Sequence, residues 1–359
     1  MTATSIASAR VLHLLEHQGV GGVTRSVIEL VRHERMDGAG DEIVLVERAL
    51  DVDADFAAPA TPVHFLGIGE PDRKRRAQRL VDLAHSRGAR AVHAHCESAL
   101  DFIGLASGAG LSTVATLHLP PSERSFLGRR RRRSVLRGLD GLFVSNPALV
   151  EPWSRFGRRP EVLPLAVDPS RFHPGAEPSS WRVLRAPDPE TLLVGSLMRA
   201  EEGKRDDVLF DAVEARAAAG RKTALILVGD GPTYEERKAR ARGSDVLHVR
   251  KRVFDVTSWM AMIDVLALHD GSELTPMALL EGLACARPVV VADRGPVAAL
   301  VGDEAATFVP PGDVQAVVAA LDALADADRR VELGRQGRER ILAHHALADV
   351  RRALGPLYA

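Results

Sequence analysis

The stretch that decides the fold runs from residue 263 to residue 292 and reads IDVLALHDGSELTPMALLEGLACARPVVVA. It opens with a mostly apolar run, and Pro288-Val-Val-Val-Ala292 closes it as a buried parallel strand would. Between the two runs, Thr275 can cap a helix, and Pro276 suits the first helical position, where a missing N–H costs nothing. The stretch therefore predicts a strand, a helix and a second strand.

Two glutamates stand out in this unit. Glu273 lies in the loop before the predicted helix, and Glu281 lies inside the helix. If both were helical, eight residues at about 100° each would leave them roughly 80° apart, so one amphipathic stripe explains the pair poorly. A ligand held over the helix N-terminus explains it well. On local pattern alone, two solvent-exposed acids beside an ordinary cap are an equal alternative.

Length and composition favour a cytoplasmic protein with two domains. The chain has 359 residues, more than a single core usually serves, and a formal net charge of −1 argues against nucleic acid as the main partner. Cys96 and Cys285 lie in apolar surroundings, where we expect reduced thiols. No apolar run approaches the roughly 20 residues of a membrane span, and residues 1–5 do not resemble the start of a signal peptide.

Short apolar runs alternate with amphipathic stretches throughout the chain. The expected strands are 11–15, 43–46, 63–66, 91–95, 113–118 and 142–145, and then 191–195, 224–229, 246–249, 264–268, 289–292 and 307–309. This rhythm predicts two doubly wound parallel sheets.

The predicted domain boundaries follow from this rhythm. The proline-rich segment Asp168–Pro189 is expected to connect the two sheets, and residues 328–357 are expected to be helical. We predict an N-terminal Rossmann-like domain over residues 1–168, joined by a helix over residues 345–359. The second Rossmann-like domain covers residues 169–344.

Two strand-to-helix turns have the residues of an anion site. Gly19-Val-Gly-Gly-Val-Thr-Arg25 follows the first strand, and glycines let backbone N–H groups approach an anion at a helix N-terminus. Thr24 stands where a dinucleotide site has its third glycine, and a turn without a ligand is the alternative. In the second half, Arg199 and Lys204 could converge on a diphosphate, although such residues are more often solvated. Gly229-Asp-Gly-Pro232 indicates a structural turn, with Asp230 capping the next helix.

Three histidines, His93, His95 and His118, lie at or near the carboxyl ends of expected strands, the edge where α/β sheets bind ligands. Their spacing matches no zinc motif, and packing is the favoured role for His93 and His95. His118 is the best placed to face a cleft. The acids of residues 51–55 offer ligands for a divalent ion only superficially, since a solvated loop explains them better.

Two basic runs, Arg73–Arg76 and Arg129–Arg133, begin predicted helices, where cations oppose the helix dipole. Anionic lipid headgroups or a phosphorylated acceptor would offset that cost. Solvated charge is the favoured alternative for each run.

Together these features resemble the retaining glycosyltransferases of family 4, which have the GT-B fold. The resemblance covers nearly the entire chain. Its most specific element is the pair of glutamates separated by seven residues, Glu273 and Glu281. Further matches are Ser272-Glu-x-x-Pro276, Leu280-Glu-Gly-Leu-Ala284, Arg287-Pro-Val289, Gly21-Gly22, His118, Ser145, Val167-Asp168, Phe172-x-Pro174, Arg199 with Lys204, and Gly229–Pro232.

The resemblance implies two Rossmann-like domains that face a central cleft, an acceptor-binding N-terminal domain and a donor-binding C-terminal domain. Arg199 and Lys204 would bind the donor diphosphate, with Gly21 and Gly22 close to it, and His118 would line the sugar site. Glu273 would contact sugar hydroxyls, and Glu281 would hold the ribose. Further donor contacts would come from Thr275, Pro276, Met277, Ala278 and Val253, and acceptor-side candidates are His95, Ser145 and Asn146.

This sequence also departs from the family pattern. Leu119 stands where the family often has an acid, Leu165-Ala166 replaces Asn-Gly, Ser196 replaces an arginine, and Ala286 replaces a glycine. Leu119 bears on how the acceptor is handled. Ser196 leaves Arg199 as the only nearby substitute in the diphosphate clamp.

The reaction implied is transfer of a sugar from a nucleotide-diphosphate sugar, UDP- or GDP-linked first, to a hydroxyl of a glycan, lipid or small natural product, with retention and without a metal or cofactor. Rival interpretations are a phosphorylase or epimerase on the same fold, an NAD(P)-dependent oxidoreductase using Gly19–Gly22, and a non-catalytic homologue that binds a partner. Cytoplasmic location is expected, with the basic runs leaving open a peripheral contact with the inner face of an anionic membrane. Oligomeric state is left open.

Overall fold

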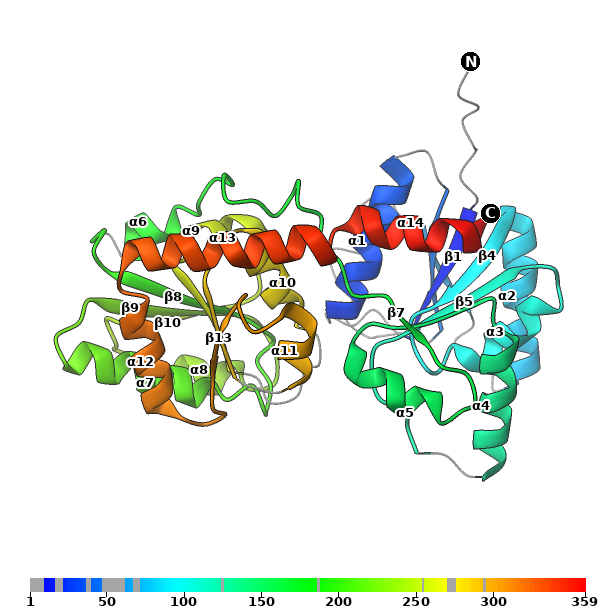
Figure 1. Ribbon diagram of the computed structural model, residues 1–359, viewed down its shortest axis with the longest axis horizontal. Coiled ribbons are helices and arrows are strands. Elements are labelled where there is room, and N and C mark those ends of the chain that lie inside the picture. Colours follow the sequence, from blue (N-terminus) through cyan, green and yellow to red (C-terminus); the bar gives the residue numbers. More distant parts are fainter. Residues whose placement is uncertain are drawn as a thin grey trace, which may run out of the picture. The chain divides into compact units, whose positions relative to one another are not determined.

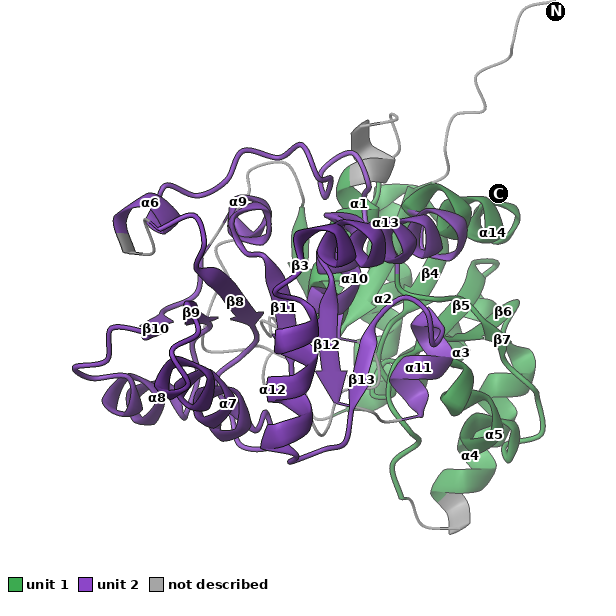
Figure 2. Ribbon diagram, turned by 60° about the vertical axis from the view of Figure 1, so that its left-hand side comes forward, with its two compact units in different colours: residues 1–165, 347–359 green, residues 166–346 purple. Residues whose placement is uncertain are grey.

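Two parallel sheets organise the chain in the computed structural model (Figure 1). The structure describes residues 10–16, 22–36, 40–46, 62–66, 72–123, 126–185, 188–253, 255–269, 276–292 and 295–359. The chain divides into two compact units, residues 1–165 with 347–359 and residues 166–346 (Figure 2).

The described strands of the first unit form one sheet in the order β3-β2-β1-β4-β5-β6-β7, with every neighbouring pair parallel. They are β1 (Arg10–Leu15), β2 (Glu42–Leu45), β3 (Val63–Phe65), β4 (Ala89–Ala94), β5 (Ser112–Leu117), β6 (Gly141–Val144) and β7 (Glu161–Val162). The helices are α1 (Gly22–Met36), α2 (Arg73–Arg87), α3 (Leu100–Ser107), α4 (Phe126–Gly138), η1 (Pro147–Leu149), α5 (Val150–Ser154) and α14 (Leu347–Tyr358).

The described strands of the second unit repeat this order as β10-β9-β8-β11-β12-β13, again with parallel pairs. They are β8 (Leu192–Leu197), β9 (Thr223–Val228), β10 (Leu247–Arg250), β11 (Val265–Leu268), β12 (Val289–Ala292) and β13 (Thr307–Val309). The helices are α6 (Trp181–Arg185), α7 (Asp206–Ala218), α8 (Tyr234–Arg240), α9 (Val256–Met262), α10 (Met277–Ala284), α11 (Pro296–Val301), α12 (Val314–Ala323) and α13 (Ala327–His344).

Every run expected as a strand contains one, so the predicted doubly wound α/β class is confirmed. Strands such as β9 and β12 are buried along their whole length, as parallel strands covered on both faces must be. The prediction missed β7 because its two residues are exposed and carry no apolar pattern.

Helices cover both faces of each sheet. In the first unit α3 lies between α2 and α4 over β4 and β5, and α14 packs on the same two strands (Figure 2). In the second unit α7 and α12 close a core with Leu209, Val213, Leu225 and Leu321, while α10 lies against α13. None of the helices in the described residues combines the length and apolar character that crossing a bilayer requires.

Three details differ from the prediction. The helix after β11 begins at Met277, and Pro276 is its N-cap, since a ψ of 117° keeps the proline outside the helix. The run Arg129–Arg133 does not begin a helix, because α4 extends upstream to Phe126, so opposition to the helix dipole does not explain it. The segment expected to connect the domains is part of the second unit, where Trp181 of α6 packs on Trp259.

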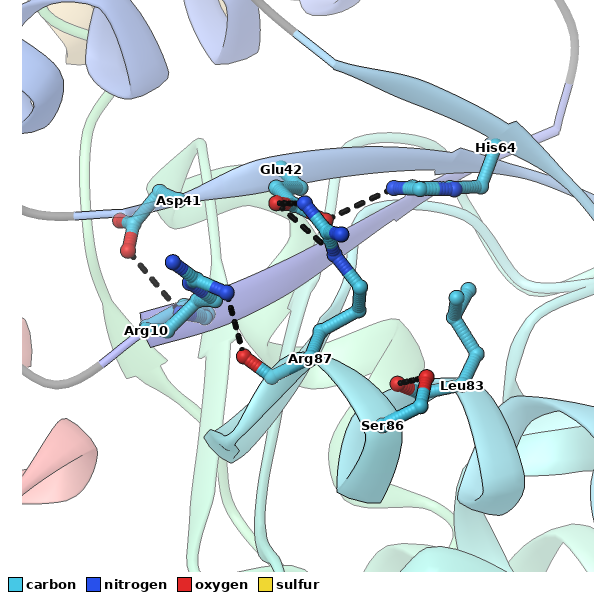
Figure 3. A network of polar contacts seen from close by, with 8 residues as sticks. Arg10, Asp41, Glu42, His64, Leu83, Ser86 and Arg87 are labelled. Carbon is cyan, nitrogen blue, oxygen red and sulfur yellow. Dashed lines mark hydrogen bonds and ion pairs between the residues drawn. The ribbon is translucent and has the colours of Figure 1, made fainter.

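A buried carboxylate ties together the amino ends of the first strands (Figure 3). Glu42 accepts two hydrogen bonds from Nε of Arg87, at 3.1 and 2.9 Å, and its Oε2 lies 2.7 Å from Nε2 of His64. Arg10 donates to the carbonyl of Arg87 at 2.5 Å. Burial alone would raise the pKa of Glu42, but the hydrogen bonds from Arg87 and His64 hold that pKa below its ordinary value.

This network makes a stability prediction. Glu42→Gln should lower the free energy of unfolding by roughly 1–3 kcal/mol at pH 7, because Arg87 and His64 lose charge-assisted hydrogen bonds. A depressed pKa stabilises the fold above the ordinary carboxyl pKa of 4.5, and the contribution is lost as pH falls through the folded-state pKa. The difference between variant and wild type should therefore shrink below about pH 4.5 in urea unfolding measured across pH.

A matched control exists in the same unit. Glu151 pairs with Arg159 at 2.8 Å, but its side chain is 77% exposed. Glu151→Gln should change stability by less than about 0.5 kcal/mol at any pH, since exposed pairs contribute little. Equal effects of the two substitutions would contradict the role given to Glu42.

Candidate functional site

Several of the predicted donor-binding residues follow strands of the second sheet, at its carboxyl edge. Arg199 and Lys204 follow β8, Val253 follows β10, and α10 follows β11. The strands β8 and β11 are neighbours although they are not consecutive, so this edge holds the point where the strand order reverses. Open α/β sheets bind ligands at that point.

Arg199 and Lys204 meet at a carboxylate. Nε of Arg199 lies 3.4 Å from Oε2 of Glu201, and Nζ of Lys204 lies 3.8 Å from Oε1 of the same residue. Lys204 is fully buried, whereas the Arg199 side chain is half exposed. The two basic residues are thus brought together around one anionic group. Sequence reasoning missed Glu201, whose signal is its position between the two cations.

An arginine fixes the loop that carries these residues. Arg237 of α8 donates to the carbonyl of Arg199 at 3.1 Å and pairs with Asp206 at the start of α7. Burial raises the pKa of Asp206 to about 6 against the opposing attraction of Arg237, and burial also lowers the pKa of Arg237. Burial thus shifts the pKa of each residue toward its neutral form. The ion pair therefore holds the two side chains in place at a cost in desolvation free energy.

The glycine turn after β9 packs closely against the same loop. A Cβ on Gly229 would lie 1.8 Å from the carbonyl oxygen of Met198, and one on Gly231 would lie 2.3 Å from that of Ala200. The turn is structural, as predicted. Asp230 does not cap α8, however, because its Oδ1 accepts the N–H of Gly231 and the N-cap is Thr233.

Helix α10 holds Glu281 inside the unit. Glu281 is 1% exposed and lies in the second turn, while Pro276, Met277 and Ala278 form the helix start. The first turn of a helix has N–H groups without partners inside the helix, and these favour an anion. Gly334 of α13 allows close packing, since a Cβ there would lie 2.0 Å from the carbonyl oxygen of Ala286.

Several predicted residues lie outside the described residues: Gly21, Glu273, Thr275 and the acids of residues 51–55. Gly22 is described and begins α1. Of the two cysteines, Cys285 is buried and Cys96 is half-buried, and neither forms a disulfide.

His118, predicted to line the sugar site, and the predicted acceptor-side residues follow strands of the first sheet. His118 follows β5 and is 8% exposed, and neither of its ring nitrogens has a hydrogen-bond partner among the described residues. Burial lowers the pKa of His118 to about 4, so the ring is neutral at pH 7. Ser145 follows β6, and its buried hydroxyl has no hydrogen-bond partner in the part of the chain that the structure describes, whereas Asn146 caps η1 by accepting the N–H of Ala148 at 2.9 Å. His95 follows β4 and is 6% exposed.

A buried arginine holds the loop that follows His118. Arg132 of α4 donates to the carbonyl of Ser122 at 3.1 Å and pairs with Glu97, which itself accepts the N–H of Ser122 at 2.7 Å. The guanidinium also lies over the rings of Trp153 and Phe156. Arg132 is therefore a structural residue rather than a solvated one. The sequence did not indicate this role, because the neighbouring residues of the run are also arginines.

Comparison with known proteins agrees with this geometry. The structure superposes on Anabaena Alr3699/HepE in complex with UDP-glucose with a TM-score of 0.78 over 97% of this chain and 98% of that one, at 19% identity. This likeness concerns the fold alone. Two doubly wound parallel sheets of this kind define a GT-B protein.

The chain belongs to the family 4 glycosyltransferases. The family model described as Glycosyltransferase Family 4 matches residues 20–171, and the one described as Glycosyl transferases group 1 matches residues 188–327. The predicted family is thus confirmed.

Two curated relatives illustrate how the similarity is distributed. A GDP-mannose-dependent alpha-(1-6)-phosphatidylinositol dimannoside mannosyltransferase of Mycobacterium tuberculosis is 33% identical over 144 residues, which are 39% of this chain and 38% of that protein. The putative glycosyltransferase EpsF of Bacillus subtilis is 24% identical over 308 residues, which are 79% of each chain. The higher sequence identity is therefore confined to a part of the chain, whereas the similarity that covers most of the chain has a lower identity.

The Arg132 contacts predict an asymmetry within the basic run. Arg132→Met should lower the free energy of unfolding by about 2–4 kcal/mol, because Glu97 loses a buried ionic partner. Arg129→Met, three residues earlier on the exposed face, should change it by less than about 0.5 kcal/mol. Chemical denaturation of both variants measures the difference, and equal stabilities would refute the structural role of Arg132.

Proposed function

We propose that this protein transfers a sugar from a nucleotide-diphosphate sugar to a hydroxyl acceptor, with retention at the anomeric carbon. The observation that carries the proposal is the pair Arg199 and Lys204, held around a carboxylate at the strand-order reversal of the second sheet. Two fixed cations at the end of a strand suit a diphosphate, which is the leaving group of such a donor. Membership of the family supports the same reaction.

The second unit is the proposed donor-binding unit. Arg199 and Lys204 would bind the diphosphate in place of the Glu201 carboxylate, which the donor phosphates would displace. The N-terminus of α10, at Pro276–Ala278, would add backbone donors. Glu281 would accept the ribose hydroxyls. Glu273, Thr275, Val253, Gly21 and Gly22 keep the donor roles that the family resemblance implies.

A UDP- or GDP-sugar is the proposed donor. The mycobacterial relative is described as GDP-mannose-dependent, and the Anabaena protein was crystallised with UDP-glucose. Among the residues that the structure describes, no contact selects a base. We therefore propose the diphosphate and the sugar as the recognised groups.

The first unit is the proposed acceptor-binding unit. A neutral His118 at the end of β5 can donate a hydrogen bond to a sugar hydroxyl or accept one from it, since none of the described residues bonds either ring nitrogen. His95, Ser145 and Asn146 follow neighbouring strands at the same edge. Arg132 and Glu97 would keep the loop after His118 in place for the acceptor.

The proposed chemistry is an attack by the acceptor hydroxyl from the face that the diphosphate leaves. Positive charge then develops on the sugar ring and negative charge on the diphosphate, which takes the proton of the acceptor. Arg199, Lys204 and the N-terminus of α10 would stabilise that leaving group, so the proposal requires no metal ion at the diphosphate.

Substitution of the donor residues tests the reaction. Glu273→Gln should reduce donor hydrolysis about 100-fold or more and leave the fold intact, because a sugar contact made in the transition state is lost. Arg199→Met should have a similar effect through the diphosphate. The assay is hydrolysis of UDP-, GDP-, ADP-, CDP- and dTDP-sugars, chosen first by thermal shift.

The control is Glu202→Gln, an exposed acid in the Arg199 loop that has no proposed contact. It should keep near-wild-type hydrolysis. Near-normal turnover in the Glu273 variant would refute the proposed sugar transfer. A thermal shift with NAD(P)H and with none of the nucleotide sugars would favour an oxidoreductase instead.

We also propose a peripheral membrane contact by a cytoplasmic enzyme. The two basic runs lie on α2 and α4, on either side of α3, where Arg73 and Arg131 both pair with Asp101. Leu105 of α3 is 50% exposed between them. Cations around an exposed apolar side chain suit an anionic lipid surface.

Charge reversal tests this contact. The triple variant Arg129→Glu, Arg130→Glu and Arg133→Glu should bind vesicles of phosphatidylcholine with about one-third phosphatidylglycerol at least about 10-fold more weakly, since each basic residue contributes about 1 kcal/mol. The control reverses three exposed cations of the second unit, Lys238, Arg242 and Arg329. Cosedimentation measures binding, and equal binding of both triple variants would reject the surface.

A further inference from the structure

Four histidines gather inside the first unit, on one face of its sheet. His13 of β1 is the register partner of His93 of β4, and His95 and His118 follow β4 and β5. His13 and His93 are fully buried, and His95 is 6% exposed. Parallel neighbours in register project their side chains to the same face, so the strand pairing itself brings these rings together. Sequence reasoning had missed His13, whose signal is a polar residue inside a buried strand.

Three of these rings converge. One ring nitrogen from each of His13, His93 and His95 lies within 4.8 Å of the others. Nδ1 of His13 lies 3.1 Å from Nε2 of His95. Two imidazole nitrogens that share a tetrahedral zinc ion, each about 2.0–2.1 Å from the metal, are about 3.3 Å apart. The His13–His95 pair is thus close to the spacing that a shared ion imposes.

A carboxylate stands behind the first ring. Oδ2 of Asp41 lies 3.5 Å from Nε2 of His13, the nitrogen that faces away from His95, and Oδ1 of Asp41 accepts the N–H of Val11 at 2.9 Å. Metal-binding histidines commonly direct their second nitrogen to such a carboxylate, which orients the ring and makes it a better ligand.

The ring of His93 is also held from outside the cluster. Its Nδ1 lies 2.6 Å from the hydroxyl of Tyr358 on α14, and its Nε2 lies 2.8 Å from Oγ1 of Thr116 on β5. Either oxygen can serve as the outer partner while the other nitrogen faces an ion.

Several ring nitrogens of this cluster are buried without a hydrogen-bond partner among the described residues. They are Nδ1 of His95 and both nitrogens of His118. Each such group costs free energy unless something compensates.

We propose that His13, His93 and His95 form a binding site for a divalent transition-metal ion, and we take zinc first because imidazole is one of its common protein ligands. Imidazole ligands suit zinc, copper and nickel, whereas magnesium and calcium prefer oxygen. The ion would link β1 to β4 inside the sheet. Its role is structural, because the three rings are buried in the core of the first unit and the diphosphate residues belong to the second unit. This inference does not rest on the proposed function.

Metal content tests the site directly. The full chain, freed of any affinity tag, is unfolded in chelator, refolded with one to two equivalents of Zn²⁺ and gel-filtered before elemental analysis. Wild type should retain about one zinc per chain, and its melting temperature should fall on chelator treatment, since a site absent from the unfolded chain couples binding to folding. Retention below about 0.1 equivalent would overturn the proposal.

Cobalt gives a second readout that does not depend on any variant. Co²⁺ in place of Zn²⁺ should produce the intense visible absorption of a tetrahedral nitrogen site, at about one equivalent per chain. A weak octahedral spectrum identical to that of free Co²⁺ would also overturn the proposal. Either result is obtained with the wild-type chain alone.

Matched substitutions locate the ligands. His13→Gln and His95→Gln should lower zinc retention at least about 10-fold, as loss of a ligand does. His85→Gln should leave it unchanged, because His85 is exposed on α2, where its Nε2 lies 3.3 Å from the carbonyl oxygen of Ala109. Folding of each variant is checked by circular dichroism. Wild-type retention in both ligand variants would assign the metal to another site and refute the inference.

Discussion

The parallel direction of the strands is the constraint on which the rest of this structure depends. Every described strand pair in both sheets is parallel, so the strands of each sheet end at one common edge. The loops at these edges carry His118, Arg199 and the helix with Glu281. The opposite edge of the first sheet holds the Glu42 network, which serves stability. The candidate site residues therefore lie at the carboxyl ends of the strands, and the stabilising Glu42 network lies at the amino ends.

The loop after β8 is organised by charges that balance one another within the second unit. Glu201 lies between Arg199 and Lys204, and Asp206 pairs with Arg237 beneath them. Buried ion pairs cost desolvation, but they hold side chains in a defined place. A cationic loop that is already ordered needs little reorganisation when an anionic ligand replaces the carboxylate. The proposed diphosphate site would gain affinity from this order.

The sequence predicted the parts of this structure that depend on local pattern. Apolar runs identified every described strand except β7, whose two residues are exposed, and two glutamates with their surroundings identified the family. Contacts between distant residues could not be read in the same way. Arg132 looked like one of five equivalent arginines until the structure placed it against Glu97 and Trp153. His13 met His95 only through the pairing of β1 with β4.

The last helix gives the first unit an unusual dependence on chain order. Tyr358 of α14 contacts His93, and the carbonyl of Leu357 accepts the hydroxyl of Ser112, so α14 completes a core that begins at β1. All of residues 166–346 separate this helix from the rest of its unit. During synthesis on the ribosome, the first sheet must therefore wait, with part of β4 and β5 uncovered, until the second unit has been made. Protection of that face by a chaperone would matter most in this interval.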